Sequence, residues 1–197
     1  MKIFRKIAFA LTAVMALSLT SCNYNSLVEK QQKVDQSWAQ VENQYQRRAD
    51  LIPNIVNTVK GYAEHESSTL ESVTNARAGL TKAYDAAKAI EDPQKNIEQY
   101  QQAQSALKGA LDIYVNAVRE AYPDLKANTN FMALQTELEG TENRISTERK
   151  RYTEAVMEYN TSIKKFPTNI YAGWLGFKEK PQFKAEAGAE KAPKVEF

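Results

Sequence analysis

Few residues in this sequence combine the side-chain type and the spacing that chemistry requires. The single histidine, His65, has Tyr62 rather than a glutamate three positions before it, so it cannot belong to the Glu-x-x-His pairs of di-metal helix bundles. Glu137, Glu139 and Glu142 are crowded together, but acids this close along one helix do not face each other across a cleft, as paired-acid hydrolysis requires. We therefore predict a protein that is not an enzyme and that uses no metal ion or cofactor.

The single cysteine, Cys22, has a more informative place in the chain, at the end of a short apolar run. Residues 1–6 are basic and residues 7–19 are apolar, which is typical of a secretory signal. The run is too short to span about 30 Å of hydrocarbon, so a transmembrane helix is disfavoured. Residues 19–22, Leu-Thr-Ser-Cys, resemble the bacterial lipobox, in which the cysteine becomes the acylated first residue of the mature chain.

This pattern predicts a lipoprotein signal peptide over residues 1–21 and a lipid, such as palmitate, on Cys22; cleavage without lipidation is the alternative. Several acyl chains would anchor the protein stably, because each buried methylene contributes about 0.8 kcal/mol. Asn23 follows the cysteine. A lipoprotein sorting signal with no aspartate at this position resembles those that direct proteins to the outer membrane, facing the periplasm.

Charge argues against nucleic acid as a partner. The formal net charge is +2, and the signal peptide carries three basic residues and no acid. The mature chain is therefore nearly neutral, whereas nucleic-acid binders concentrate basic charge on one face.

Apolar residues at steps of three and four predict four amphipathic helices. The stripes are Leu27, Val34, Trp38, Val41, Tyr45, Ile52, Val56 and Val59; then Leu70, Val73, Arg77, Leu80, Tyr84 and Ala87; then Ile97, Tyr100, Gln104, Leu107, Leu111, Tyr114, Val118 and Ala121; and finally Phe131, Leu134, Leu138, Ile145, Tyr152, Val156, Tyr159, Ile163 and Phe166.

Prolines and capping residues predict where these helices end. Pro53 should kink or briefly break the first helix. Asp92 and Pro93 read as the N-cap and first residue of the third helix, which Pro123 ends. Asn128 or Thr129 should cap the fourth helix, before Pro167 ends it.

Short loops make neighbouring helices antiparallel, so the predicted fold is all-α, an up-down-up-down four-helix bundle over residues 27–166 with long first and fourth helices. Residues 22–26 form a short tether. Residues 167–197 form an irregular, aromatic C-terminal tail. We expect its first part to pack on the bundle; the alternative is an exposed apolar patch for a partner.

Folding the chain at turns near positions 65, 92 and 125 predicts one polar layer. In this register Asn54 faces Arg77, Arg77 faces Leu107, and Leu107 faces Arg144, with an error of about one turn. A guanidinium in an apolar stripe needs a carboxylate partner, which Asp50 or Glu142 could supply. The predicted layer consists of Asp50, Asn54, Arg77, Glu142 and Arg144.

Gly140 lies at the same level and suggests a close approach of another helix. The layer either fixes the helix register or binds something, and we favour the structural role.

Three stretches resemble the LemA family of bacterial membrane-associated proteins. They are residues 46–65, beginning Gln-Arg-Arg-Ala-Asp-Leu-Ile-Pro-Asn; residues 122–144, beginning Tyr-Pro-Asp-Leu-Lys; and Phe-Pro-Thr-Asn at 166–169 with the closing residues 192–197. The resemblance implies an N-terminal membrane attachment and a helical bundle, and it supplies no biochemical activity. Many members use a transmembrane helix where this chain has a lipobox.

Anchor, helical rod and lack of catalytic groups together indicate a scaffold or adaptor of the cell envelope, which binds the membrane and an unknown protein partner. The alternative is a protein that binds a small molecule or peptide at the polar layer near Pro53. The sequence leaves the oligomeric state open.

Overall fold

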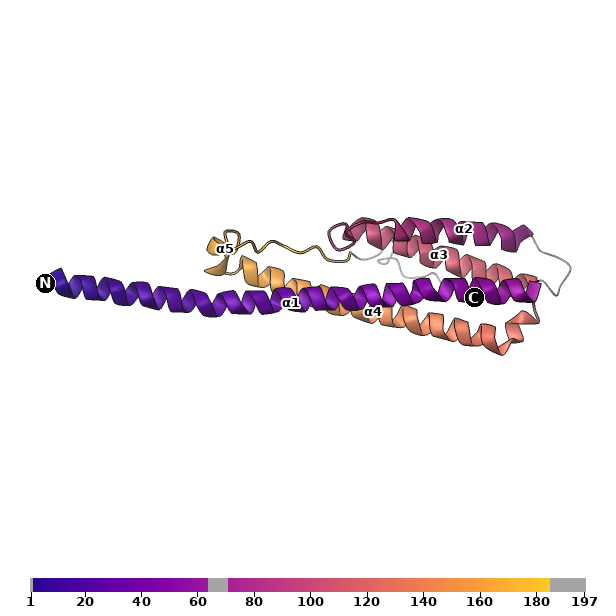
Figure 1. The fold of residues 1–197 in the computed structure, drawn as a ribbon, viewed down its shortest axis with the longest axis horizontal. Coiled ribbons are helices and arrows are strands. Elements are labelled where there is room, and N and C mark those ends of the chain that lie inside the picture. Colours follow the sequence, from indigo (N-terminus) through magenta and orange to yellow (C-terminus); the bar gives the residue numbers. More distant parts are fainter. Residues whose placement is uncertain (1, 64–70, 185–197) are drawn as a thin grey trace, which may run out of the picture. The chain divides into compact units, whose positions relative to one another are not determined.

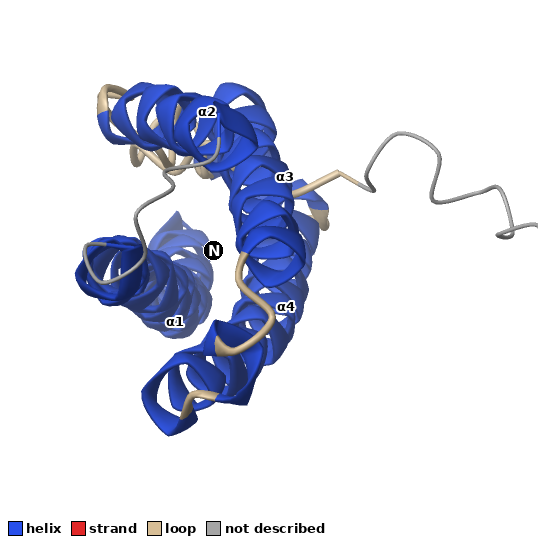
Figure 2. Cartoon of the chain, turned by 90° about the vertical axis from the view of Figure 1, so that its right-hand side faces the viewer, coloured by secondary structure: helices blue, strands red, loops and turns tan. Residues whose placement is uncertain are grey.

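The computed structural model of the 197-residue chain describes residues 2–63 and 71–184, and for residues 2–23 and 126 only the backbone. The described residues form helices and connecting turns, with no strand among them (Figure 2). The helices are α1 (Lys2–Ala63), α2 (Glu71–Lys88), α3 (Ile97–Ala121), the 3-10 turn η1 (Leu125–Ala127), α4 (Thr129–Lys164) and α5 (Thr168–Tyr171).

The chain divides into two compact units, and α1 and α4 contribute residues to both. The first unit consists of Met1–Ala39 and Arg151–Lys180, and contains the start of α1, the end of α4 and α5 (Figure 1). The second consists of Gln40–Lys150 and Pro181–Phe197, and contains α2 and α3 with the remainder of α1 and α4. Four helices therefore pack together only in the second unit.

Two ring pairs define the relative direction of α1 and α3 in the second unit. Tyr45 packs edge-on against Tyr100, and Tyr62 packs edge-on against Tyr122, with ring centroids 5.3 and 6.0 Å apart. Because both numbers rise together, α1 and α3 are parallel. The predicted up-down-up-down, all-α arrangement is confirmed.

Apolar burial stabilises this four-helix core. Its fully buried side chains come from every helix of the unit and from η1. They include Ile55, Leu80, Leu111, Tyr114, Val118, Tyr122, Leu125 and Phe131.

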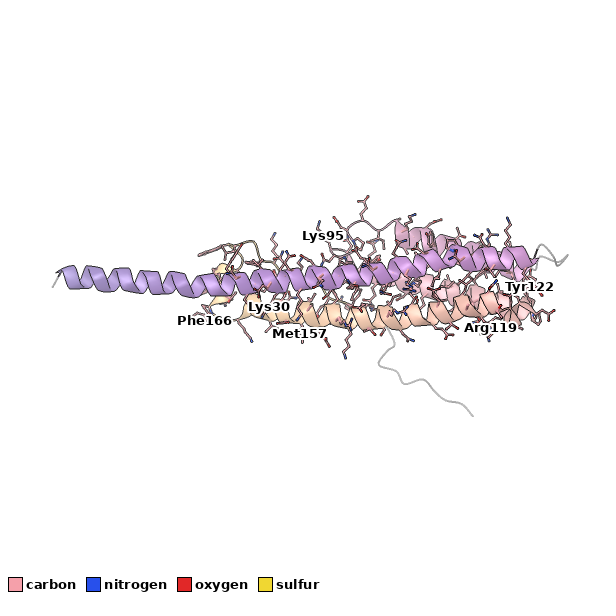
Figure 3. The ribbon with its side chains drawn as sticks, turned by 60° about the horizontal axis from the view of Figure 1, so that its bottom comes forward. Lys30, Lys95, Arg119, Tyr122, Met157 and Phe166 are labelled. Atoms are coloured by element: carbon pink, nitrogen blue, oxygen red, sulfur yellow. The ribbon has the colours of Figure 1, made fainter. Side chains whose placement is uncertain are left out.

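The first unit is an antiparallel pair of helices, in which rising numbers on α1 meet falling numbers on α4. Lys30 donates to Ser162 at 2.7 Å, Lys33 donates to Glu158 at 2.9 Å, and the Trp38 ring lies 5.2 Å from that of Tyr152. The hydrogen bond from Lys33 lowers the pKa of the exposed Glu158 carboxyl below its usual value. Lys30 and Met157 lie on this pair in Figure 3.

Helix α1 runs without interruption through Pro53, so the predicted break at this proline is wrong. Proline removes one backbone donor from a helix and disfavours the α conformation of the residue before it. Here Leu51, Ile52 and Ile55 are buried on both sides of Pro53. Their packing holds the helix together across the missing hydrogen bond.

The predicted start of α3 is wrong, and that of α4 is confirmed. Helix α3 begins at Ile97 with Asn96 as its N-cap, so the prediction that Asp92 caps this helix is wrong. Asp92 has a φ of 45° and its backbone oxygen accepts from the amides of Lys95 and Asn96, so residues 92–96 form a separate turn. Asn128 does cap α4, as predicted, because its side-chain oxygen accepts from the backbone amide of Phe131.

Replacing Asn128 with alanine should lower the free energy of unfolding by about 1 kcal/mol. The change removes the acceptor that the amides of Asn130 and Phe131 use at 3.0 and 3.3 Å. Chemical denaturation measures the effect. Asn128→Asp, which keeps the acceptor, should lose much less, and equal losses for the two variants would contradict the cap.

The C-terminal tail is held by two side-chain amides. In the first unit, Asn160 donates to the backbone oxygen of Lys180 and accepts from its amide, at 2.9 and 3.0 Å. In the second unit, Gln101 makes the same pair of hydrogen bonds with Lys184, at 2.8 and 3.1 Å. The described part of the tail is therefore ordered by specific contacts.

The side chains of the tail divide into buried and exposed ones, and whether the exposed ones meet a partner stays a prediction. Phe177 is buried, whereas Ile170, Trp174 and Leu175 are exposed. Phe166, which the sequence placed on the buried stripe, is 80% exposed; this prediction is wrong because α4 already ends at Lys164.

Cys22 and the residues before it lie in α1, whose backbone is helical from Lys2 onward. Within the helices that the structure describes, no segment is both long and apolar enough to cross a bilayer. The signal peptide over residues 1–21 and the tether over residues 22–26 remain predictions. Leu70, the first residue of the predicted second stripe, lies outside the described residues.

Candidate functional site

The most deeply buried charge in the described residues is the guanidinium of Arg48 in α1, which is 2% exposed. The stripe of α1 passes from Tyr45 to Ile52, and position 48 falls between them at steps of three and four. A residue at that position must face the core of the bundle. The helical period thus puts a charged side chain among apolar neighbours.

Three helices supply the groups that surround this guanidinium. Its Nη1 donates to Glu142 Oε1 of α4 at 2.9 Å. Its Nη2 donates to the backbone oxygen of Gln104 in α3 at 3.0 Å, and also to the side-chain oxygen of that residue. The Tyr45 ring lies below it, with Cζ 5.1 Å from the ring centroid. We call Tyr45, Arg48, Gln104 and Glu142 the Arg48 layer.

The Arg48 layer is almost completely satisfied by its own members. Arg48 Nε has no hydrogen-bond partner among the described residues, but both terminal nitrogens are engaged. Removing a charge from water costs several kcal/mol unless a partner and hydrogen bonds compensate. The carboxylate of Glu142, 23% exposed, provides that compensation. The layer therefore ties α1 to α3 and α4 in one register.

Tyr100 extends the same layer on α3. Burial raises the pKa of its phenol to about 12, and the nearby Tyr45 adds to this rise. The phenol therefore stays protonated at neutral pH and acts as a neutral hydrogen-bonding group.

Two clefts open beside the Arg48 layer, both within the second unit. One holds about 260 Å³ and is lined by Arg48, Glu142 and Arg149, among others. The other holds about 500 Å³ and is lined by Tyr84, Lys88 and Tyr100, among others. Ligand pockets commonly span about 300–1,000 Å³, so the larger cleft has room for a small molecule.

Of the five residues predicted for a polar layer, only Glu142 belongs to the Arg48 layer. Asp50 is exposed and accepts from Gln46 on its own helix at 2.7 Å. Asn54, Arg77 and Arg144 are exposed as well. The prediction that Arg77 is the buried guanidinium is wrong, because α2 turns this residue toward solvent although its stripe neighbours Val73 and Leu80 are buried.

The predicted level was close, and the predicted residues were wrong. Arg48 meets Gln104 and Glu142, which lie within about one turn of the predicted levels on α3 and α4. A sequence signal for the correct residues exists. Each of three stripes has a polar residue at its core position near this level, namely Arg48, Gln104 and the pair Thr141 and Glu142.

Gly140 does not mark a close helix approach, which corrects that expectation. A Cβ built on Gly140 would come no nearer than 4.0 Å to another group, and that group is the flexible end of Arg144. The helix therefore bears the conformational cost of this glycine without a packing benefit.

Gly140→Ala should raise the free energy of unfolding by about 1 kcal/mol, because alanine restricts the unfolded chain and favours helix. Thermal unfolding measures it. Gly176→Ala is the matched contrast, since Gly176 has a φ of +86° and an L-residue there should destabilise the protein. A Gly140→Ala protein that unfolds earlier than the wild type would refute the open-space interpretation.

Other predicted sites are placed as follows. Among the described residues no group of three or more histidine, cysteine, aspartate or glutamate side chains could hold a metal ion. His65 lies outside the described residues. Glu137 forms a surface ion pair with Arg47 at 2.8 Å. Cys22 lies two residues before Tyr24 on α1, and its acylation remains a prediction.

Comparison with known proteins identifies relatives over most of the chain. Residues 37–197 match the model of the LemA family. The chain is 26% identical over 148 residues to Protein LemA of Metamycoplasma hominis, covering 75% of this chain and 63% of that protein. It is also 26% identical to Magnetosome protein MamQ 2 of Paramagnetospirillum magneticum, covering 91% of this chain and 71% of that protein.

A further relative is Magnetosome protein MamQ of Magnetospirillum gryphiswaldense, which is 25% identical over 88% of this chain and 69% of that protein. The family match covers α1 from residue 37 onward, α2, α3, α4 and the whole Arg48 layer. The chain belongs to the LemA family.

Proposed function

We propose that this chain is a lipid-anchored, non-enzymatic scaffold or adaptor of the cell envelope, held through Cys22 to the outer membrane and facing the periplasm. Its partner is another protein. The observation that carries the proposal is the position of Cys22, five residues before Leu27, which is the first buried residue among the side chains of α1 that the structure describes. A lipid there would hold the helical rod at the bilayer without a long spacer.

The Arg48 layer supports a structural rather than catalytic role for the core. Its charge is compensated internally, by Glu142 and Gln104, and the neighbouring phenol of Tyr100 has a raised pKa of about 12. Similarity to proteins named for the magnetosome supports a place in a membrane-associated assembly. Such an assembly requires surfaces that recognise protein.

Two exposed apolar side chains of the second unit are suited to that recognition. Ile113 on α3 is 63% exposed, and Met132 on α4 is 52% exposed. Large apolar side chains on the surface of a helix are natural anchors at a protein interface. We assign them to contacts with the partner.

Photocrosslinking in intact cells tests the adaptor. A photoreactive residue at Ile113 or Met132 should give one protein adduct of defined mass and near-stoichiometric yield, and the same residue at exposed Lys82 should give none. Ile113→Asp should abolish the adduct formed at Met132 if both contact one partner. Absence of any protein adduct at both positions would contradict an adaptor.

A second candidate function rests on the 500 Å³ cleft. It would bind a small molecule or peptide at Tyr84, Lys88 and Tyr100, which lie at the Arg48 layer rather than at Pro53. Native mass spectrometry of protein purified from membranes should then show an additional non-covalent mass. Lys88→Glu should reduce its occupancy several-fold, whereas Lys82→Glu should not. Protein without an added mass would exclude this candidate.

A further inference from the structure

Four large apolar side chains are exposed between the end of α4 and the turn that follows α5, within the first unit. They are Phe166, 80% exposed, Ile170, 56%, Trp174, 86%, and Leu175, 49%. We call them the anchor-proximal surface. Exposed apolar side chains that cluster in this way mark an interaction site more often than a chance feature of the surface. The end of α4 with Phe166 is visible in Figure 3.

Backbone hydrogen bonds order the segment that carries Trp174 and Leu175. The amide of Leu175 donates to Tyr171 at 3.1 Å, and that of Phe177 donates to Ala172 at 3.0 Å, so residues 171–177 form a compact turn after α5. Ile170 and Trp174 are four residues apart along this helical turn, a spacing that brings side chains to one side. The surface is therefore preformed.

The surface lies directly beside the predicted point of lipidation. Phe177, which is buried, packs edge-on against Tyr24 with ring centroids 5.6 Å apart. Tyr24 follows Cys22 by two residues in the same helix, which corresponds to about 3 Å along the helix axis. A lipid on Cys22 would thus hold residues 166–175 at the bilayer surface.

Side-chain chemistry in this segment is that of a membrane interface. Tryptophan prefers the headgroup level, where its ring is partly apolar and its N–H is hydrated. Residues 164–179 contain Lys164, Lys165 and Lys178 and one acidic residue, Glu179, which pairs with Lys164 at 2.8 Å, so the segment keeps a net positive charge. Clustered lysines attract anionic phospholipid headgroups. The apolar side chains and the charge favour the same occupant.

We propose that the anchor-proximal surface inserts into the headgroup region of the bilayer and forms a second membrane contact beside the lipid on Cys22. This inference rests on the proposed membrane anchoring. Two contacts close to the same end would restrain the tilt of α1 and α4 in the first unit, which a single flexible acyl anchor does not do.

Tryptophan quenching by brominated lipids tests the contact. The chain has two tryptophans, so Trp38→Phe leaves Trp174 as the sole reporter in the full-length, cell-processed protein. Reconstituted in vesicles of phosphatidylcholine and phosphatidylglycerol, Trp174 should shift its emission to the blue and lose roughly half its intensity to shallow bromines, and less to deep ones. In Trp174→Phe protein the buried Trp38 should not be quenched.

Matched charge substitutions provide the control. Ile170→Asp with Leu175→Asp, in the Trp38→Phe background, should return Trp174 to the unquenched level. Met157→Asp replaces an equally exposed apolar side chain of α4 outside this surface, and should leave the quenching unchanged. Loss of quenching in both variants would show a general charge effect and overturn the proposal.

Flotation of the same vesicles separates this inference from the proposed function. Protein that floats with the vesicles while Trp174 stays unquenched would overturn the anchor-proximal contact and leave the lipid anchor intact. Protein that does not float would contradict both. A blue shift that depends on protein concentration without vesicles would identify a second copy as the occupant, and would also overturn the proposal.

Discussion

Glu142→Ala should lower the free energy of unfolding by about 2–3 kcal/mol. The substitution leaves the guanidinium of Arg48, 2% exposed, without the carboxylate that lies 2.9 Å from its Nη1. Breaking a fully buried pair costs about 3–5 kcal/mol, and the 23% exposure of Glu142 reduces this figure because water can reach the vacated space. Urea denaturation followed by circular dichroism measures the loss.

Glu137→Ala is the matched control on the same helix. Glu137 pairs with Arg47 at the same kind of distance, 2.8 Å, but the two side chains are 42% and 49% exposed. A surface pair contributes about 0–1 kcal/mol. If Glu142→Ala costs no more than Glu137→Ala, Arg48 is not held by a buried ion pair.

The double variant Arg48→Met with Glu142→Leu completes this prediction. Replacing both charges by apolar groups of similar size removes the desolvation cost together with the attraction, and is often neutral or stabilising. The double variant should therefore recover most of the stability that Glu142→Ala loses. A double variant less stable than Glu142→Ala alone would show that Arg48 contributes through more than its pair.

The second large effect is expected in the first unit, where Tyr152→Ala should destabilise the protein by about 3–5 kcal/mol. Tyr152 is fully buried, and its ring packs edge-on against Trp38. Alanine would leave a cavity beside Trp38, and the surrounding helices relax into such a cavity only in part.

Thermal unfolding in a Trp174→Phe background, in which Trp38 is the sole tryptophan, reports this loss directly by fluorescence. Met157→Ala on the same helix removes a side chain that is 59% exposed, and should change stability by less than about 0.5 kcal/mol. Similar transitions for the two variants would mean that Tyr152 does not pack as described.

Helical periodicity predicted the fold because apolar steps of three and four survive in every helix. The stripes of α1 and α3 are buried almost throughout, with Val56 and Ala121 half-buried. The effect of Pro123 was predicted correctly, and the break at Pro53 was not. Pro123 follows the end of α3, whereas Pro53 lies inside α1, where buried neighbours outweigh the lost hydrogen bond.

Periodicity was less informative about the polar layer. The stripe of α2 includes Arg77. Such a stripe covers more of the helix surface than the line of buried residues, so a long charged side chain at its edge can reach water. Arg48 was overlooked because it follows Arg47 in a polar segment that reads as surface. Its step from Tyr45 was the available signal. Which of two adjacent arginines is buried depends on the rotation of α1, and contacts with α3 and α4 decide this.

The Arg48 layer sets the register of the helices, and the proposed attachment at Cys22 sets the place of the protein at the membrane. The layer gives the buried charge of Arg48 a structural role in a protein for which we propose no catalytic one. The proposed attachment gives a role to the exposed Phe166 and Trp174, which belong to the same unit as Tyr24 and its ring partner Phe177. Both depend on long helices that position side chains far apart in the sequence.

Intact-mass spectrometry of protein extracted from cell membranes tests the proposed anchor most directly. The account predicts a mature chain that begins at Cys22 and carries covalent acyl groups on that residue, while Cys22→Ser protein carries none. A membrane-derived chain in which Cys22 is unmodified, or in which residues 1–21 are still present, would contradict it.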